Sequence, residues 1–140
     1  MKESLFNFDF KIAVFDLDLT LWNSEDLYPD VLSILQMLKQ CNIPLYIASF
    51  HKEALQCCDD LNISNYFDNI YYGRHMNKLQ MINEIKKQHV DIQDHEIVFF
   101  DDNPHNIQHV QKNSNIKSIL VNEGLSWGYI PIKCSMQFFM

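Results

Sequence analysis

Four carboxylates in this sequence stand directly after short apolar runs. Asp16 and Asp18 follow the first of these runs, and Asp101 and Asp102 follow the fourth. In an open parallel sheet the carboxyl ends of the strands meet at one edge, where ligands bind, so we expect these carboxylates to lie close together. Crowded carboxylates repel one another, and a divalent cation is the usual means of holding them. Hard oxygen donors of this kind favour Mg²⁺ over zinc.

A hydroxyl group and an ammonium group are expected at the same edge. Ser49 follows the second apolar run, and Lys78 stands near the start of the third segment with helical periodicity. A carboxylate beside Mg²⁺ can attack phosphorus and form an aspartyl-phosphate, which is the role we predict for Asp16. A second carboxyl two residues on, Asp18, can protonate the leaving oxygen and then accept a proton from water. Serine and lysine can stabilise the phosphoryl oxygens in the transition state.

The elements that must position these residues alternate along the chain. Short apolar runs predict strands at residues 12–15, 43–48, 66–72, 97–100 and 116–121. Apolar residues at helical spacing predict helices at residues 30–40, 54–61, 78–85 and 103–110. This alternation is typical of βαβ units, so we predict an α/β fold with a five-stranded, mostly parallel sheet covered by helices on both faces.

The whole chain is expected to form a single domain, because 140 residues is an ordinary domain length. We predict its core at about residues 11–121. Residues 5–10 alternate between apolar and polar types like a short extra strand. Residues 122–140 form a C-terminal extension, whose aromatic side chains we expect over the sheet edge or against another subunit.

The composition limits the partners of this protein. Its 18 acidic and 11 basic residues give a formal net charge of −7, which disfavours binding to nucleic acid or to an acidic membrane surface. No apolar run reaches the ~18 residues that a spanning helix needs, and residues 1–4 do not begin a signal peptide. We therefore expect a cytoplasmic protein. The four cysteines show no CxxC spacing, which argues against a zinc knuckle.

The candidate residues occur in motifs that resemble those of the haloacid dehalogenase superfamily of phosphatases. Residues 15–22, FDLDLTLW, contain the first motif of that superfamily, DxDxT. Ser49, Lys78 and the Asp101–Asp102 pair then follow in the same order as the remaining motifs.

A closer resemblance is to the eukaryotic-type magnesium-dependent phosphatases. It rests on FDLDxTLW, on YPDV from Tyr28, on IAS from Ile47 and on FFDDNPHNI from Phe99, and it covers about residues 11–121. The resemblance implies a Rossmann-like three-layer domain with the strand order 5-4-1-2-3 and no cap domain. It also implies Mg²⁺ as the cofactor.

The resemblance implies a role for each carboxylate. Asp16 would be both the nucleophile and a ligand of the metal. Asp18 would be the general acid and base, and would bind the metal through its backbone carbonyl. Asp102 would bind the metal directly, with Asp101 in support.

It also implies a set of groups that hold the phosphate. The backbone N–H groups of Leu17 and Asp18 would help to cradle it. Ser49, Phe50 and Lys78 would complete the phosphate site.

The sequence departs from this family at two places. The family has an arginine directly after the serine of the second motif, where this chain reads Ser49-Phe50-His51-Lys52, so that role is vacant or passes to His51 or Lys52. The insertion before Tyr28 is also shorter than in the family. The substrate is therefore left open between a phosphotyrosine-type aryl phosphate or phosphoprotein and a phosphosugar or other phosphorylated small molecule.

Other functions fit the sequence less well. A non-catalytic signalling receiver uses similar residues, but there the acidic pair comes early, whereas here the DxD motif comes first. A catalytically inactive scaffold is disfavoured because no motif position is lost. A polynucleotide 3′-phosphatase is disfavoured by the acidic charge, and a phosphate mutase by the lack of room for a cap domain. A homodimer is left open.

Overall fold

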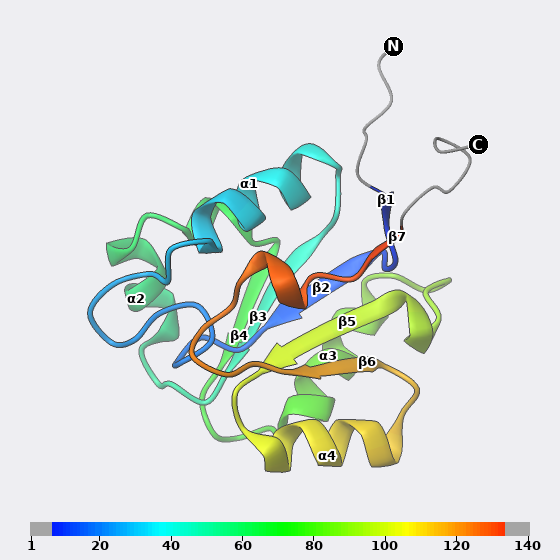
Figure 1. Ribbon diagram of the computed structural model, residues 1–140. Coiled ribbons are helices and arrows are strands. Elements are labelled where there is room, and N and C mark those ends of the chain that lie inside the picture. Colours follow the sequence, from blue (N-terminus) through cyan, green and yellow to red (C-terminus); the bar gives the residue numbers. More distant parts are fainter. Residues whose placement is uncertain (1–6, 134–140) are drawn as a thin grey trace, which may run out of the picture.

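A five-stranded sheet lies at the centre of the protein, of which the computed structural model describes residues 7–133 (Figure 1). Its strands are β2 (Ile12–Phe15), β3 (Leu45–Ser49), β4 (Asn69–Tyr72), β5 (Ile97–Asp101) and β6 (Lys117–Leu120). Neighbouring strands are all parallel, in the spatial order β4-β3-β2-β5-β6. Numbered along the chain this order is 3-2-1-4-5, which confirms the predicted order read from the opposite edge.

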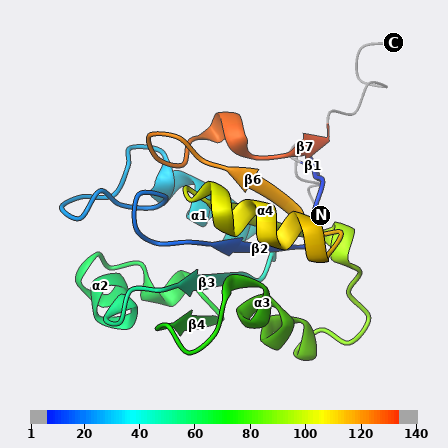
Figure 2. The ribbon, with the colours of Figure 1, turned by 90° about the horizontal axis from the view of Figure 1, so that it is seen from below.

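Helices cover both faces of this sheet. They are α1 (Val31–Gln40), α2 (Ala54–Asp60), α3 (Lys78–Lys87) and α4 (Pro104–Asn113). Two separate clusters of buried side chains place α1 and α2 on one face and α3 and α4 on the other, and Figure 2 shows α3 beside β3 and α4 beside β6. The predicted three-layer α/β fold is therefore confirmed. No helix within residues 7–133 is long and apolar enough to cross a membrane.

The central strands are apolar on both sides because both faces of the sheet are covered. Every residue of β2 and β5 is buried, including Asp101 at the end of β5. Phe15 and Phe100 lie on neighbouring strands and stack with their ring centroids 5.2 Å apart. Continuous apolar runs are typical of parallel strands, so the first polar residue of each run marks the end of its strand.

The third predicted strand begins later than expected. It was predicted from Tyr66 but begins at Asn69, because the backbone N–H of Tyr66 donates to Ile63 O at 3.1 Å and closes a turn after α2. This turn is one of three 3₁₀ helices within residues 7–133, which are η1 (Ser64–Tyr66), η2 (Asp94–Glu96) and η3 (Trp127–Tyr129).

Two other strand boundaries shift slightly. β3 begins at Leu45 rather than Ile43, because the backbone N–H of Ile43 donates to Leu38 O at the end of α1, at 3.0 Å. β6 occupies the inner part of the predicted residues 116–121.

Residues 122–133 pack on the same face of the sheet as α1. Leu125 and Ile130 are buried in the core of that face. Trp127 Nε1 donates to Ser33 Oγ of α1 at 3.0 Å. The aromatic residue Trp127 thus contacts α1. The predicted contact of this segment with the sheet edge or with another subunit stays a prediction.

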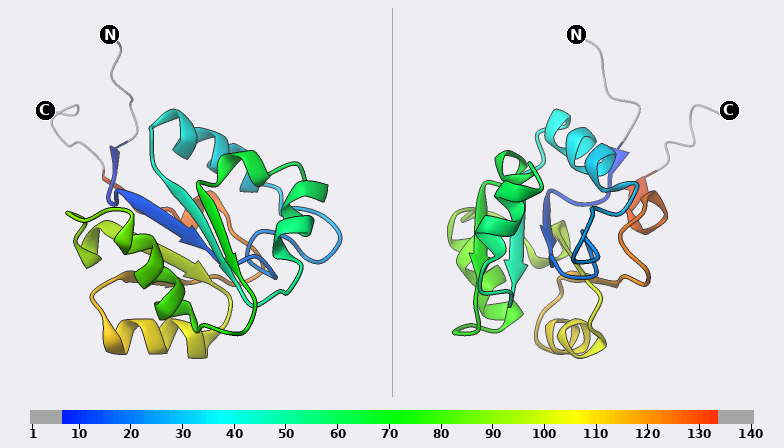
Figure 3. Two further views of the ribbon diagram at one scale, coloured as in Figure 1. Left: turned by 180° about the vertical axis from the view of Figure 1, so that it is seen from behind. Right: turned by 90° about the vertical axis from the view of Figure 1, so that its left-hand side faces the viewer.

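A second, two-stranded sheet joins the two ends of the described chain. β1 (Asn7–Phe8) pairs antiparallel with β7 (Ile132–Lys133). The extra strand predicted within residues 5–10 is therefore confirmed at Asn7–Phe8, while residues 1–6 and 134–140 lie outside the described part. Figure 3 shows this pair at the end of the sheet where β2 begins, away from the carboxyl ends of the parallel strands.

A substitution at Gly124 tests how closely the C-terminal segment packs against Tyr28. Its φ is +90°, in the left-handed region, and a Cβ at this position would lie 2.3 Å from the ring of Tyr28. We expect Gly124→Ala to lower the free energy of unfolding in urea by about 1–3 kcal/mol, the usual range for overpacking. Gly128→Ala is the matched control, because a Cβ there meets nothing closer than 3.7 Å. An equal loss in both variants would contradict the packing described.

Candidate active site

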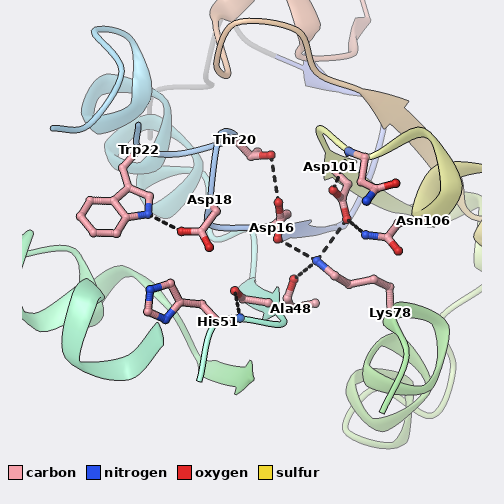
Figure 4. A network of polar contacts seen from close by, with 11 residues as sticks. Asp16, Asp18, Thr20, Trp22, Ala48, His51, Lys78, Asp101 and Asn106 are labelled. Carbon is pink, nitrogen blue, oxygen red and sulfur yellow. Dashed lines mark hydrogen bonds and ion pairs between the residues drawn. The ribbon is translucent and has the colours of Figure 1, made fainter. Parts of the chain in front are cut away.

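The carboxyl ends of three neighbouring strands bring the predicted site residues together (Figure 4). Asp16 directly follows β2, Ser49 ends β3, and Asp101 ends β5. Lys78 is the first residue of α3, and all four side chains line one pocket of about 190 Å³. Because β2 lies between β3 and β5, Asp16 occupies the middle of the group.

Lys78 is a buried cation held by three acceptors. Its Nζ lies 2.7 Å from Asp16 Oδ1, 3.1 Å from Asp101 Oδ2 and 2.7 Å from the backbone oxygen of Ala48. An ammonium group has three N–H donors, and two of them form hydrogen bonds, to Asp16 and to Ala48, while the contact to Asp101 is an ion pair. The side chain is only 2% exposed. Its backbone is fixed by Asn77, whose side chain caps α3 through Gln80 N.

Three carboxylates form a compact acidic cluster beside this lysine. One oxygen from each of Asp16, Asp101 and Asp102 lies within 4.8 Å of the others. Burial raises the pKa of Asp16 to about 8, against the lowering effect of Lys78, and the charge of Asp101 raises it further. Burial also raises the pKa of Asp102. Ionised carboxylates are therefore unfavourable here unless further positive charge is brought to them.

Asp101 is bound by protein donors on both oxygens. Its Oδ1 accepts from the backbone N–H of Asn103 at 2.9 Å, and its Oδ2 accepts from Asn106 Nδ2 at 3.0 Å and from Lys78. Asn103 is the N-cap of α4, and Asn106 lies in its first turns. Asp101 thus joins the end of β5 to α4, while Asp102 is only half-buried and lines the pocket.

Asp18 lies apart from the acidic cluster, at the wall of the same pocket. Its Oδ1 accepts from Trp22 Nε1 at 2.7 Å (Figure 4). The turn between them is closed by hydrogen bonds from Leu19 N–H to Trp22 O at 2.8 Å and from Leu21 N–H to Leu17 O at 2.9 Å. Trp22, which sequence reasoning did not assign to the site, therefore fixes the direction of the Asp18 carboxylate.

The motif threonine also contacts the central carboxylate. Thr20 is fully buried, and its Oγ1 donates to Asp16 Oδ2 at 3.4 Å. Leu19 has a φ of 61°, in the left-handed region, and its side chain is 50% exposed at the pocket. A leucine in this conformation is strained, and such strain is common at functional sites.

The residues after Ser49 do not supply the cation that the resemblance implies at this point. Phe50 and His51 line the pocket, whereas Lys52 does not. Both ring nitrogens of His51 are already engaged, since Nδ1 accepts from Glu53 N–H at 3.0 Å and Nε2 lies 3.7 Å from Cys57 Sγ. His51 therefore forms part of the wall rather than a free positive charge.

Arg74 lines the pocket and was missed by sequence reasoning. It lies in the loop between β4 and α3, and no motif or spacing identifies it. The signal that could have found it is that Arg74 is the only arginine in the sequence.

The pocket has no separate domain above it in the described structure. The two loops that could carry a cap, residues 19–30 after β2 and residues 73–77 after β4, are short connections. Residues 19–30 are further folded onto themselves, with Tyr28 N–H donating to Leu21 O at 3.0 Å.

Comparison with known proteins gives the class of this protein. Residues 23–133 match the acid phosphatase family, so the chain belongs to this family and is a phosphatase. No curated protein matches it.

Solved structures share the fold. A haloacid dehalogenase-like hydrolase from Streptococcus pneumoniae superposes with a TM-score of 0.67 at 14% identity, covering 86% of this chain and 87% of that one. The 3-deoxy-D-manno-octulosonate 8-phosphate phosphatase from Moraxella catarrhalis was solved with magnesium, phosphate and KDO. It superposes with a TM-score of 0.58 at 18% identity, covering 91% of this chain and 80% of that one. The cobalt-bound deoxy-D-mannose-octulosonate 8-phosphate phosphatase of Haemophilus influenzae superposes with a TM-score of 0.61 at 12% identity, covering 94% of this chain and 84% of that one. The predicted likeness to haloacid dehalogenase phosphatases is confirmed.

Replacing Lys78 tests whether this cation holds the site together. We expect Lys78→Met to lower the free energy of unfolding by about 3–5 kcal/mol, because it leaves two buried carboxylates without their partner. Lys87→Met is the matched control at the other end of α3, where the pair with Glu84 is exposed and contributes at most about 1 kcal/mol. Urea denaturation without divalent metal measures both. Similar losses in the two variants would contradict a structural role for Lys78.

Proposed function

We propose that this protein is a Mg²⁺-dependent phosphomonoesterase that works through an aspartyl-phosphate on Asp16. The observation that carries the proposal is the position of Asp16 at the base of the pocket, 2.7 Å from buried Lys78 and inside a cluster of three carboxylates. A nucleophilic carboxylate needs positive charge beside it to bind a phosphate dianion. This arrangement supplies one cation from the chain and oxygen donors for another.

The donors in the pocket fit Mg²⁺. Asp16 and Asp102 offer carboxylate oxygens, the backbone carbonyl of Asp18 is assigned as a third ligand, and Asp101 supports the site from the protein side. All of these are hard oxygen donors, which Mg²⁺ prefers. Burial raises the pKa of Asp16 and Asp102, and a bound cation relieves this cost by favouring their ionised forms. When bound, Mg²⁺ supplies positive charge that offsets the negative charge of the phosphoryl oxygens.

The remaining groups bind and orient the phosphoryl group. Ser49 Oγ accepts from the backbone N–H of His51 at 3.0 Å, so its own O–H proton is available to donate to a phosphoryl oxygen. Lys78 lies on the other side of Asp16 and binds a second oxygen. The backbone N–H groups of Leu17 and Asp18, after β2, help to cradle the phosphate, and Phe50, after β3, completes the site.

The reaction we propose has two steps. Asp16 attacks phosphorus and forms an acyl phosphate as the bond to the leaving oxygen breaks, and Asp18 gives its proton to that oxygen. Water then attacks the phosphorus of the intermediate, Asp18 takes the proton from this water, and Asp16 and inorganic phosphate are released. Trp22 holds Asp18 at the pocket wall during both transfers.

The substrate we propose is a small phosphate monoester, either an aryl phosphate or a sugar phosphate. Octulosonate 8-phosphate phosphatases with the same fold, named for a sugar phosphate, support this class. The pocket carries no cap domain in the described residues, so the group attached to phosphate extends toward solvent. The single-domain organisation, the eukaryotic-type subfamily, a cytoplasmic location and a homodimer stay predictions.

Metal removal tests the cofactor. Chelator is expected to abolish hydrolysis of phenyl phosphate, and Mg²⁺ to restore it while Ca²⁺ does so poorly, since Ca²⁺ prefers more ligands at longer distances. Saturating Mg²⁺ is also expected to stabilise the fold, by about 2.7 kcal/mol at 100 times its dissociation constant. Asp102→Asn is expected to lose most of this stabilisation, and Asp91→Asn, on an exposed loop, to keep it. Full activity in chelator would refute the metal assignment.

Two substitutions separate the roles of the two motif aspartates. Asp16→Asn removes the nucleophile, so hydrolysis is expected to fall to background without any phosphoenzyme. Asp18→Asn keeps the backbone carbonyl and loses only the transferable proton, so hydrolysis of an alkyl phosphate is expected to fall about 10²–10⁴-fold. A nitrophenyl phosphate is expected to lose less, because its leaving group needs no proton. Rapid quench with labelled substrate measures both, and phosphate trapped on the Asp16→Asn variant would overturn the assignment.

A further inference from the structure

Arg74 is held at the pocket by the backbone of the loop that carries it. The preceding residue, Gly73, has a φ of +100°, which favours glycine, and its N–H donates to Ser49 O at 3.0 Å. The turn at Gly73 therefore begins directly after β4 and is anchored to the last residue of β3, the serine that we propose binds phosphate. This places the guanidinium of Arg74 at the wall of the catalytic pocket, although Arg74 itself is exposed to solvent.

Arg74 and Lys78 both lie close to the ring of Phe50. Arg74 Cζ is 5.7 Å from the ring centroid of Phe50, and Lys78 Nζ is 4.8 Å from the same centroid. Contacts at this distance attract a cation to an aromatic ring, so Phe50 helps to hold both positive charges. A guanidinium that rests on a ring still presents its N–H edge to a ligand.

A second hollow adjoins the catalytic pocket at the same two residues. This side hollow, of about 280 Å³, shares Phe50 and Arg74 with the pocket and is also lined by Met76 and Gln80. A substrate whose phosphate lies at Asp16 therefore has room to extend its organic part over Phe50 and past Arg74.

The charge of Arg74 is not neutralised by an ion pair within the part of the chain that the structure describes. No carboxylate within residues 7–133 forms an ion pair with it, although the chain has a net charge of −7 and four acidic residues line the pocket. The transferring phosphoryl group already has Lys78 and Ser49. Arg74 is thus a cation that remains available to a second negative group.

We propose that Phe50 and Arg74 form a leaving-group subsite, which binds a carboxylate carried by the alcohol or phenol part of the substrate. Arginine presents a planar pair of donors that matches the two oxygens of a carboxylate. Phe50 covers the carbon skeleton between that carboxylate and the phosphate. This inference rests on the proposed phosphomonoesterase function and names its substrate class, a phosphate monoester with a nearby carboxylate.

A pair of matched esters tests the subsite. Phenyl phosphate and 3-carboxyphenyl phosphate release phenols of similar basicity, so a difference in kcat/KM reports binding of the carboxylate rather than leaving-group chemistry. With Mg²⁺ present, the wild type is expected to prefer the carboxylated ester about 10–100-fold, through KM, as for a hydrogen bond to a charged group. Arg74→Ala is expected to lose this preference and Arg74→Lys to keep part of it. Lys52→Ala, a nearby exposed lysine outside the pocket wall, is expected to keep it fully.

Other outcomes would overturn the subsite. One is a wild type without preference, and another is an Arg74→Ala variant that loses activity equally on both esters, which would place Arg74 on the transferring phosphoryl group. If the wild type hydrolyses neither ester, the proposed function fails by itself. Calorimetric binding of the two esters to the Asp16→Asn variant, with and without Arg74→Ala, then decides the subsite. Tighter binding of the carboxylated ester that depends on Arg74 supports it, and equal binding overturns it.

Discussion

The buried ammonium group of Lys78 is the interaction on which the site depends. It belongs to α3 but contacts the residue after β2, the last residue of β5 and a backbone oxygen of β3. Removing a charge from water costs several kcal/mol, and the three acceptors offset this cost. The same contacts tie a helix on one face to the three central strands. Catalytic geometry and tertiary packing are therefore held by one group.

The order of the strands explains why a pocket lies at that point. The chain leaves β2 toward α1 on one face of the sheet, and leaves β5 toward α4 on the other face. The loops that follow these neighbouring strands diverge, and a crevice opens between them, as at the switch point of other doubly wound sheets. Asp16 lies on one side of this crevice, and Asp101 and Asp102 lie on the other.

Sequence reasoning found the residues whose positions follow from periodicity. Asp16, Ser49 and Asp101 end apolar runs, and a parallel sheet must gather such ends at one edge. It failed where local hydrogen bonds compete with strand pairing, as at Tyr66, whose N–H closes a turn instead. It also failed at Arg74, because a turn at Gly73 positions this side chain at the pocket and no sequence pattern predicts that turn.

The sequence by itself determined the α/β class, the strand order through its resemblance, and which carboxylates meet, because buried runs and their polar ends are local properties. Only the tertiary structure decided how each carboxylate is held, and therefore which of them is open to a ligand. Asp101 is saturated by donors from α3 and α4, whereas Asp18 is turned by Trp22 toward the pocket wall. These contacts depend on side-chain directions and on close packing between segments distant in sequence, which periodicity does not encode.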